Sequence, residues 1–345
     1  MTFKNLIRGT ISGIALSACL AASTAFAAEM PKKVGYITNY ATHEWYQNVI
    51  KGMEDRAAQL GFEIEVIDAN LDMAKQVSAA EDFMARNIDV LIITPVNEEG
   101  VVPILRRAKA NGVPVVLEGN PAKGMDVLVA ICDYDTGYHA GVASGEYLAA
   151  KGGDSARVMN VGLPLLSATI LRSNGFMDGI RTIIPGAELT HDLDGAGSAD
   201  RSQEVASAAL AVDANINVIY GINDSSALGG LQAWRAAGLS EDELLVVGTG
   251  GEGLAFMNEM AKNGPLQLEA AMFPEKVGFT AIDAAVSMFN GEDLPEHIVS
   301  PTTTFDTASL SDYYVLTSDT TRQIQWDAVN ALVAPASCMK YASDL

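Results

Sequence analysis

Histidine and cysteine are scarce in this chain, whose 345 residues include four histidines and three cysteines. No two cysteines lie at the short spacing typical of zinc ligands, and the histidines are scattered, so the pattern predicts no metal site. No Gly-x-Ser-x-Gly motif occurs, and no histidine accompanies an obvious serine or cysteine nucleophile. We therefore expect no metal, no cofactor and no catalytic residues.

Basic residues are also few: Lys and Arg number 22 against 43 Asp and Glu, which gives a formal net charge of −21. A chain this acidic is repelled by nucleic acids and by anionic membrane surfaces. Because the acidic residues form no long run, the pattern indicates a solubilising surface rather than an acidic binding tail.

Long apolar runs are missing too, since none reaches the ~18–20 residues of a membrane-spanning helix. The N-terminal apolar stretch, Ile11–Leu20, follows Lys4 and Arg8 and precedes a small-x-small site at 25–27. This is the pattern of a secretory signal peptide. We predict that residues 1–27 are removed on export to the periplasm, and losing two positive charges moves the formal charge from −21 to −23.

Each cysteine bears on how the protein is exported or stabilised. The stretch Leu16–Cys19 resembles the lipidation motif of bacterial lipoproteins, in which case Cys19 would be lipidated and residues 20–33 would become a tether. We favour the free periplasmic form, because the small-residue site after Cys19 is well formed. Only Cys132 and Cys338 follow that site. The oxidising periplasm permits a disulfide between them, and two buried free thiols are an equally open alternative.

From residue 33 onward, short apolar runs alternate with segments of helical periodicity. The first half predicts strands at 34–37, 63–67, 90–94 and 113–117, and helices at 45–60, 74–86 and 101–110. This alternation predicts a parallel, doubly wound α/β sheet covered on both faces. The rhythm restarts after Asp133, with helices at 138–149 and 227–237 and strands at 157–161, 187–191, 218–220, 244–247 and 268–272. We therefore expect two similar α/β lobes.

Polar and aromatic residues follow several of these strands. They are Thr38–Tyr40, Glu118–Asn120, Gly221–Asp224 and Thr249–Gly251. Open α/β sheets bind ligands beyond the carboxyl ends of their strands. The sequence therefore predicts a small-molecule site at these ends.

Several motifs together resemble the ribose- and galactose-binding branch of type I periplasmic binding proteins, in order over about residues 33–305. The matching segments are Val34–Ile37, His43–Tyr46 with Gly52, Ala85–Pro95, Gly112–Val116, Ile222–Gly229 and Val246–Gly248. The resemblance implies two flavodoxin-like lobes that close by a hinge, with crossings near Asp133, Phe273 and Thr304. It divides the chain into 28–133 plus 273–304, 134–272 plus 305–317, and a tail at 318–345. It also implies a monomer, a sugar or polyol ligand, and a membrane permease with its ATPase as partners.

The same resemblance suggests ligand-binding residues. Trp45 and Tyr46 occupy positions where the family stacks aromatics on the ligand ring, although two aromatics at a helix start can also belong to the core. Arg172 and Asn223 match polar ligand-binding positions of the second lobe, while Arg172 has the alternative of a surface ion pair. His43 lies at the expected cleft edge or simply starts a helix, and Asn120 follows the fourth strand.

Three departures from the family pattern affect the expected ligand. The family's Asp-Arg pair is replaced by Glu118-Gly119, an expected acid by Gly250, and an expected Gln by Met272. Because a buried hydroxyl without a partner costs about 1–3 kcal/mol, we expect a linear polyol or deoxy sugar. A small cation held by Glu118 and aromatics is the second possibility.

Other interpretations have weaker support. Gly248–Gly253 fits the dinucleotide fingerprint, but it occurs late in the chain and alone. Asp192–Glu204 nearly fits a calcium loop, but its closing acid falls one residue late, which favours a turn. A sensory binding protein that presents its ligand to a membrane kinase or chemoreceptor stays open. In that case the tail at 318–345 docks a partner; otherwise it covers apolar surface.

Overall fold

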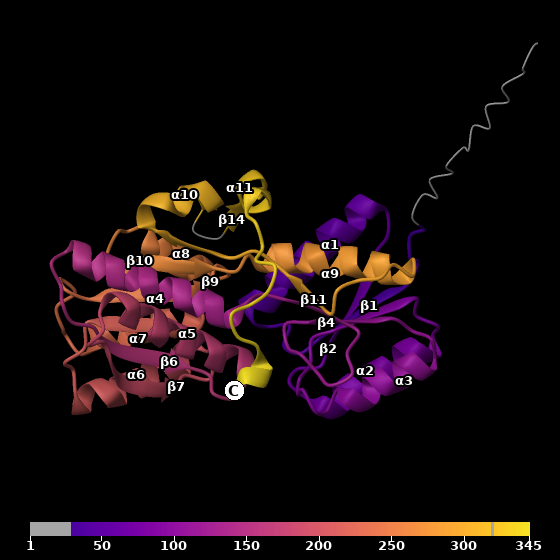
Figure 1. The fold of residues 1–345 in the computed structure, drawn as a ribbon, viewed down its shortest axis with the longest axis horizontal. Helices are drawn as coiled ribbons and strands as arrows, with labels where there is room; N and C mark the ends of the chain where they lie inside the picture. The colour runs from indigo at the N-terminus through magenta and orange to yellow at the C-terminus, as the bar shows by residue number, and fades with distance from the viewer. Residues whose placement is uncertain (1–28, 319–320) are drawn as a thin grey trace, which may run out of the picture.

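The computed structural model describes residues 29–318 and 321–345, and in it the chain forms two lobes, each built on a six-stranded sheet (Figure 1). The predicted signal peptide, with Cys19, lies outside the described residues. None of the helices within 29–318 and 321–345 is both long and apolar enough to cross a membrane. The α/β architecture predicted from the sequence, with two mostly parallel sheets, is confirmed.

The first sheet has the strand order β11-β5-β4-β3-β1-β2, and all of its pairings are parallel. Its strands are β1 (Val34–Thr38), β2 (Ile64–Asp68), β3 (Val90–Ile93), β4 (Val115–Glu118), β5 (Val127–Ala130) and β11 (His297–Val299). Helices α1 (Glu44–Leu60) and α9 (Pro274–Phe289) cover one face, and α2 (Met73–Ala85) and α3 (Val102–Ala110) cover the other (Figure 1).

Alternating side chains of the central strands supply both cores of this lobe. Tyr36 packs with the α1–α9 layer, whereas the next residue, Ile37, packs with the α2–α3 layer. In β3, Ile92 and Ile93 divide in the same way. Successive strand residues point to opposite faces, so a strand buried on both faces is apolar throughout. This explains the continuous apolar runs of the sequence.

The second sheet has the order β12-β10-β9-β8-β6-β7, with β12 antiparallel to its neighbour. Its strands are β6 (Arg157–Gly162), β7 (Glu188–Asp194), β8 (Val218–Gly221), β9 (Leu245–Gly250), β10 (Leu266–Ala271) and β12 (Thr303–Asp306). Its helices are α4 (Asp133–Ala150), α5 (Ser167–Ile183), α6 (Ala199–Val212), α7 (Asp224–Ala236) and α8 (Leu254–Met260). The chain passes between the sheets after β5, after β10 and after β11.

Helices α4 and α5 approach each other closely through glycines. A Cβ on Gly175 would lie 2.1 Å from the Tyr134 carbonyl oxygen, and one on Gly137 would lie 2.1 Å from that of Arg172. Real Cβ atoms do not approach backbone oxygens this closely, so both positions require glycine at this helix spacing. The close approach brings Arg172, on α5, next to the first turn of α4.

Replacing Gly175 with alanine is expected to lower the free energy of unfolding by about 1–3 kcal/mol, because the overlap outweighs the helix propensity that alanine adds. Urea unfolding of the purified protein measures this. The matched control is Gly186→Ala, whose Cβ would meet no heavy atom within 4 Å, and it should change stability by less than about 0.5 kcal/mol. Equal stability of the two variants would show that the helices are not held at this spacing.

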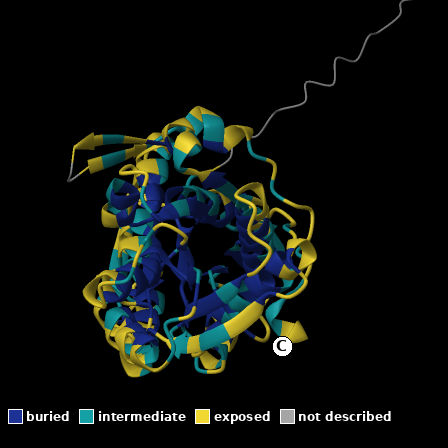
Figure 2. Cartoon of the chain, turned by 90° about the vertical axis from the view of Figure 1, so that its left-hand side faces the viewer, coloured by how far each residue is buried: buried dark blue, intermediate teal, exposed yellow. Residues whose placement is uncertain are grey.

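A C-terminal extension lies across both lobes. It contains a short 3-10 turn η1 (Thr307–Ser309), α10 (Leu310–Tyr313), the hairpin β13 (Tyr314–Ser318) and β14 (Thr321–Ile324), α11 (Trp326–Ala331) and η2 (Ala342–Asp344). The hairpin projects from the body of the protein (Figure 2). The ring of Trp326 lies 4.5 Å from that of Phe279 on α9, in the first lobe.

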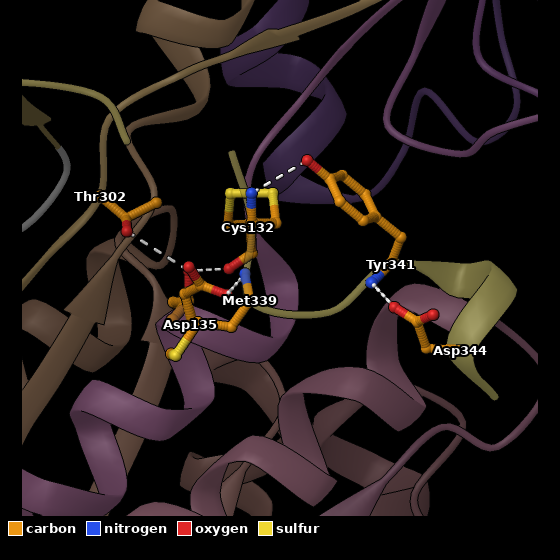
Figure 3. The surroundings of a disulfide bond; sticks show 8 residues. Cys132, Asp135, Thr302, Met339, Tyr341 and Asp344 are labelled. Atoms are coloured by element: carbon orange, nitrogen blue, oxygen red, sulfur yellow. Dashed lines mark hydrogen bonds between the residues drawn. A yellow bond between two sulfur atoms is a disulfide. The ribbon is translucent and has the colours of Figure 1, made fainter. Parts of the chain in front are cut away.

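A disulfide fixes the far end of this extension. Cys338 is bonded to Cys132, immediately before α4 (Figure 3). The neighbouring Met339 donates its backbone N–H to Asp135 at 2.9 Å, and the ring of Tyr341 lies 5.1 Å from that of His297 on β11. Of the two sequence alternatives for these cysteines, the structure has the disulfide. The extension therefore contacts both lobes and is covalently attached where the chain first passes between them.

Candidate functional site

The two lobes touch through residues of the loops and helix starts that follow their strands. Ser167 donates a hydrogen bond to Glu98 at 2.5 Å, and Asn48 donates one to the carbonyl oxygen of Glu252 at 3.2 Å. Residues 43 and 223 also approach each other, with 3.2 Å between His43 Nε2 and Asn223 Nδ2. The carboxyl edges of the two sheets therefore face one another, and the lobes are in contact there.

His43 caps helix α1 and contacts the opposite lobe. Its Nδ1 accepts a hydrogen bond from the Trp45 backbone N–H at 3.1 Å. The proton of the neutral ring is therefore on Nε2, which donates a hydrogen bond to the Gly197 carbonyl oxygen. Burial and the nearby Arg172 lower the pKa of His43, despite the Gly197 bond. A neutral imidazole thus caps α1 and lies against the second lobe, and its contact with a ligand stays a prediction.

Glu118 ends β4 and is only 1% exposed. Its Oε2 accepts a hydrogen bond from Thr94 Oγ1 at 2.5 Å, and Thr94 Oγ1 lies 2.7 Å from the Tyr36 hydroxyl. Its other oxygen, Oε1, is buried and has no hydrogen-bond partner. Burial raises the pKa of Glu118 to about 7, with a smaller upward contribution from Asp133 and a downward one from the Thr94 bond.

The two candidate stacking aromatics have different surroundings. The Tyr46 hydroxyl accepts a hydrogen bond from Asn39 Nδ2 at 3.0 Å, and burial, with the charge of Glu118, raises its pKa. Trp45 is half-buried and packs against the core on the α1–α9 face. Trp45 therefore has a packing role whether or not it also contacts a ligand.

Arg172 and Asp133 form a buried ion pair in the second lobe. Arg172 Nε donates to Asp133 Oδ1 at 2.6 Å, and Arg172 Nη1 donates to the Ile222 carbonyl at 3.1 Å. Their side chains are 14% and 9% exposed. The pair is therefore buried, and the alternative of a surface ion pair for Arg172 is wrong. Asp133 was not among the predicted site residues, because it lies 39 positions before its partner.

Asn223 is the N-cap of helix α7, where its Oδ1 accepts from the Ser226 backbone N–H at 2.8 Å. Its Nδ2 donates to the Gly197 carbonyl at 2.9 Å. Both ends of this side chain are therefore used within the second lobe, and its ligand-binding role stays a prediction.

Gly250 lacks the acidic side chain expected at its position, and the carboxylate of Glu252 lies close to that position instead. A Cβ on Gly250 would lie 1.5 Å from Glu252 Oε2, so the Glu252 carboxylate occupies the place where a side chain at 250 would begin. Glu252 is 3% exposed, and its Oε2 has no hydrogen-bond partner. Sequence reasoning missed this acid as a site residue, and the tightly turned Gly-rich stretch around it was the available signal.

Met272 and Asn120 complete the predicted set. Met272 is 1% exposed and packs in the first-lobe core, while its backbone N–H donates to the Gly250 carbonyl at 2.9 Å. Asn120 is 5% exposed and follows Glu118 at the strand end. The hydrophobic environment of Met272 makes it a packing residue at the boundary between the lobes.

Buried polar atoms without a protein partner gather at these strand ends. They include Thr38 Oγ1, Asn39 Oδ1, Glu118 Oε1, Asp224 Oδ1, Ser226 Oγ and Glu252 Oε2. Leaving such an atom unsatisfied costs about 1–3 kcal/mol. Six of them at two facing sheet edges are the arrangement that a polar ligand would satisfy.

A cavity of about 330 Å³ opens beside this region. It is lined by Gly119 from the first lobe, Asp133 and Leu171 from the second, and Lys340 and Tyr341 from the extension. Among residues 29–318 and 321–345, no group of three or more His, Cys, Asp or Glu side chains is arranged to hold a metal ion.

Comparisons with known proteins agree with this geometry. The ribose import binding protein RbsB of Bacillus subtilis is 28% identical over 271 residues, covering 78% of this chain and 85% of that protein. The D-ribose/D-allose-binding protein of Pseudomonas aeruginosa is 25% identical over 307 residues, covering 84% and 93%.

Solved structures support the fold alone. An ABC transporter solute-binding protein from Mycobacterium smegmatis with bound glycerol matches with a TM-score of 0.76 at 24% identity, covering 84% of this chain and 99% of that one. One from Actinobacillus succinogenes with bound D-allose matches with a TM-score of 0.74 at 22% identity, covering 82% and 100%. The sequence model of the family described as periplasmic binding protein domain matches residues 34–293. Because this match covers most of the chain, the chain belongs to the periplasmic binding protein family.

Proposed function

We propose that the protein is the periplasmic substrate-binding component of an ABC importer and that it captures a monosaccharide or a polyol-like molecule between its lobes. Its curated relatives include proteins named for ribose import, which supports import over the sensory alternative. The partners would be an inner-membrane permease and its ATPase, reached after export by the predicted signal peptide.

The observation that carries this proposal is the convergence of unpartnered polar atoms at the two facing sheet edges. The first lobe offers Glu118 and Asn39, and the second offers Glu252. Hydroxyl groups satisfy such atoms because each can donate and accept a hydrogen bond. A hydroxyl-rich ligand bridging both edges would favour the closed arrangement over an open one.

Four of the predicted ligand-binding residues have a part in this proposal. Trp45 and Tyr46 would offer apolar faces to the C–H groups of a sugar. Glu118 would accept hydrogen bonds, and Arg172 would use N–H groups beyond those bonded to Asp133 and Ile222. Closure would then present both lobes to the permease in one fixed geometry.

A thermal-shift screen of the protein from Ala28 onward tests the proposal. Pentoses, hexoses, deoxy sugars and linear polyols form the panel. At 100 times its dissociation constant, a ligand stabilises the folded state by about 2.7 kcal/mol, and for a domain pair of this size that is a rise of roughly 4 °C.

A binder from this screen should also make the protein more compact in small-angle X-ray scattering, because closure brings the lobes together. The expected result is at least one sugar or polyol that gives both changes. If no member of the panel raises the melting temperature, the proposed ligand class is wrong. A thermal shift with an unchanged scattering profile contradicts hinge closure.

A further inference from the structure

Resting on that proposed function, we propose that the ligand carries a protonated amino group beside its hydroxyls, as an amine-bearing sugar or polyol does, and that Glu118 receives the ammonium. Four observations lead to this chemistry: the donor–acceptor balance at the strand ends, the missing partner of Glu118, the neutralisation of Arg172, and the open space beside Gly119.

Two of the unpartnered atoms, Asn39 Oδ1 and Glu118 Oε1, lie at strand ends of the first lobe and belong to acceptor groups. Asn39 Oδ1 can only accept, and Glu118 Oε1 can only accept when its carboxyl is ionised. No buried side-chain N–H without a partner comes from the same strand ends within the described residues. An ammonium group offers three donors and no acceptor, whereas a hydroxyl offers one donor. A ligand with an ammonium therefore matches this set better than one with hydroxyls alone.

Glu118 has no basic partner. In the part of the chain that the structure describes, no ion pair includes it, and its one side-chain hydrogen bond comes from Thr94. A buried carboxylate is strongly disfavoured unless a cation or several donors compensate it. The groups facing it are Thr94 from the end of β3, Tyr36 from β1, Tyr46 from α1 and Asp133 from α4. None of these is a cation.

The charge of Arg172, a cation on the facing lobe, is already compensated by Asp133. Its Nε lies 2.6 Å from Asp133 Oδ1, with both side chains buried. A second guanidinium, that of Arg322, lies 2.9 Å from Glu275 Oε1, and its field acts on Asp224 and Glu252 rather than on Glu118. The fixed charge left over at the end of β4 is therefore negative.

Open space lies beside Gly119, the residue that follows Glu118, whereas the Glu118 side chain is itself buried. A Cβ added to Gly119 would meet no heavy atom within 4 Å, and Gly119 lines the 330 Å³ cavity between the lobes. No side chain projects from position 119, so a ligand group can approach the strand end there. A compact ammonium is suited to such a position, because it forms short charge-assisted hydrogen bonds with a carboxylate.

Isothermal titration calorimetry with matched probe pairs tests this inference. The pairs are D-glucosamine with D-glucose, D-galactosamine with D-galactose, and 2-amino-1,3-propanediol with glycerol. We expect at least one amine to bind at pH 7 at least tenfold more tightly than its hydroxyl counterpart. Burial places the pKa of Glu118 at about 7, so the amine's affinity should fall at least tenfold between pH 7 and pH 5 as the carboxylate takes up a proton.

Glu118→Gln keeps the shape of the side chain and removes the charge. It should weaken the amine at least tenfold and abolish its pH dependence, and it should weaken the hydroxyl counterpart by a smaller factor than it weakens the amine. Glu44→Gln removes the same charge from the neighbouring helix α1 and should change either affinity less than threefold. The pH series on the unaltered protein keeps the test valid if the Gln variant folds poorly.

The possible failures are distinguishable. If a sugar or glycerol binds as tightly as its amine counterpart and neither affinity depends on pH, the inference of an amine-bearing ligand is wrong, while the proposed function stands. If an amine binds preferentially but Glu118→Gln leaves its affinity unchanged, Glu118 is not the receiving group and the inference is wrong. If neither member of any pair binds, and the wider sugar and polyol screen is also silent, both proposals fail.

Discussion

Replacing Asp133 with alanine is expected to lower the free energy of unfolding by about 3–5 kcal/mol, because it leaves the buried guanidinium of Arg172 without its counter-charge. The two groups lie 2.6 Å apart, with side chains 14% and 9% exposed. Asp133 is also in the first turn of α4, where a carboxylate interacts favourably with the helix dipole. Urea unfolding at neutral pH measures the loss.

Two further variants separate the buried charge from other effects. The double variant Asp133→Ala with Arg172→Met removes both charges and should recover a large part of the lost stability, since no unpaired charge stays buried. The matched control is Asp283→Ala, which breaks the ion pair with Arg56. In this pair the Arg56 side chain is 29% exposed and the Asp283 side chain 53% exposed. It should cost at most about 1 kcal/mol. A double variant no more stable than Asp133→Ala would mean that packing, not charge, dominates.

Removing the disulfide is the second change with a large expected effect. The double variant Cys132→Ser with Cys338→Ser should lower the free energy of unfolding by about 2–5 kcal/mol. The two cysteines are 206 positions apart, and a cross-link over so long a segment restricts the unfolded chain strongly. Urea unfolding of the variant and of the oxidised protein gives the difference.

The reduced unaltered protein is the control for this variant. If the bond acts mainly on the unfolded chain, reduction with dithiothreitol and the double serine variant should give the same midpoint within error. A serine variant much less stable than the reduced protein would instead show that packing of the sulfur atoms contributes. Equal stability of oxidised and reduced protein would contradict the prediction and leave the extension held by contacts such as Trp326 with Phe279.

Several helices and strands were absent from the sequence-based prediction. Strand β5 (Val127–Ala130) and helices α5 (Ser167–Ile183), α6 (Ala199–Val212) and α9 (Pro274–Phe289) were not identified. Strand β5 has only four residues, too few for a clear period. In α5, Gly175 and Gly179 lower the apparent helix propensity, and only their contact with α4 explains why glycine occurs there.

The sequence by itself determined the repeated strand–helix alternation, the burial of both faces of each sheet, and the placing of Glu118, Asn223 and Gly250 at or just beyond the ends of strands. These follow from the local periods of strands and helices, which a single stretch of chain carries. Only the tertiary structure decided that Arg172 pairs with Asp133, that Glu252 occupies the space beside Gly250, and that Cys132 is bonded to Cys338. Ion pairs and disulfides depend on distances through space, and no local period encodes which distant residues meet.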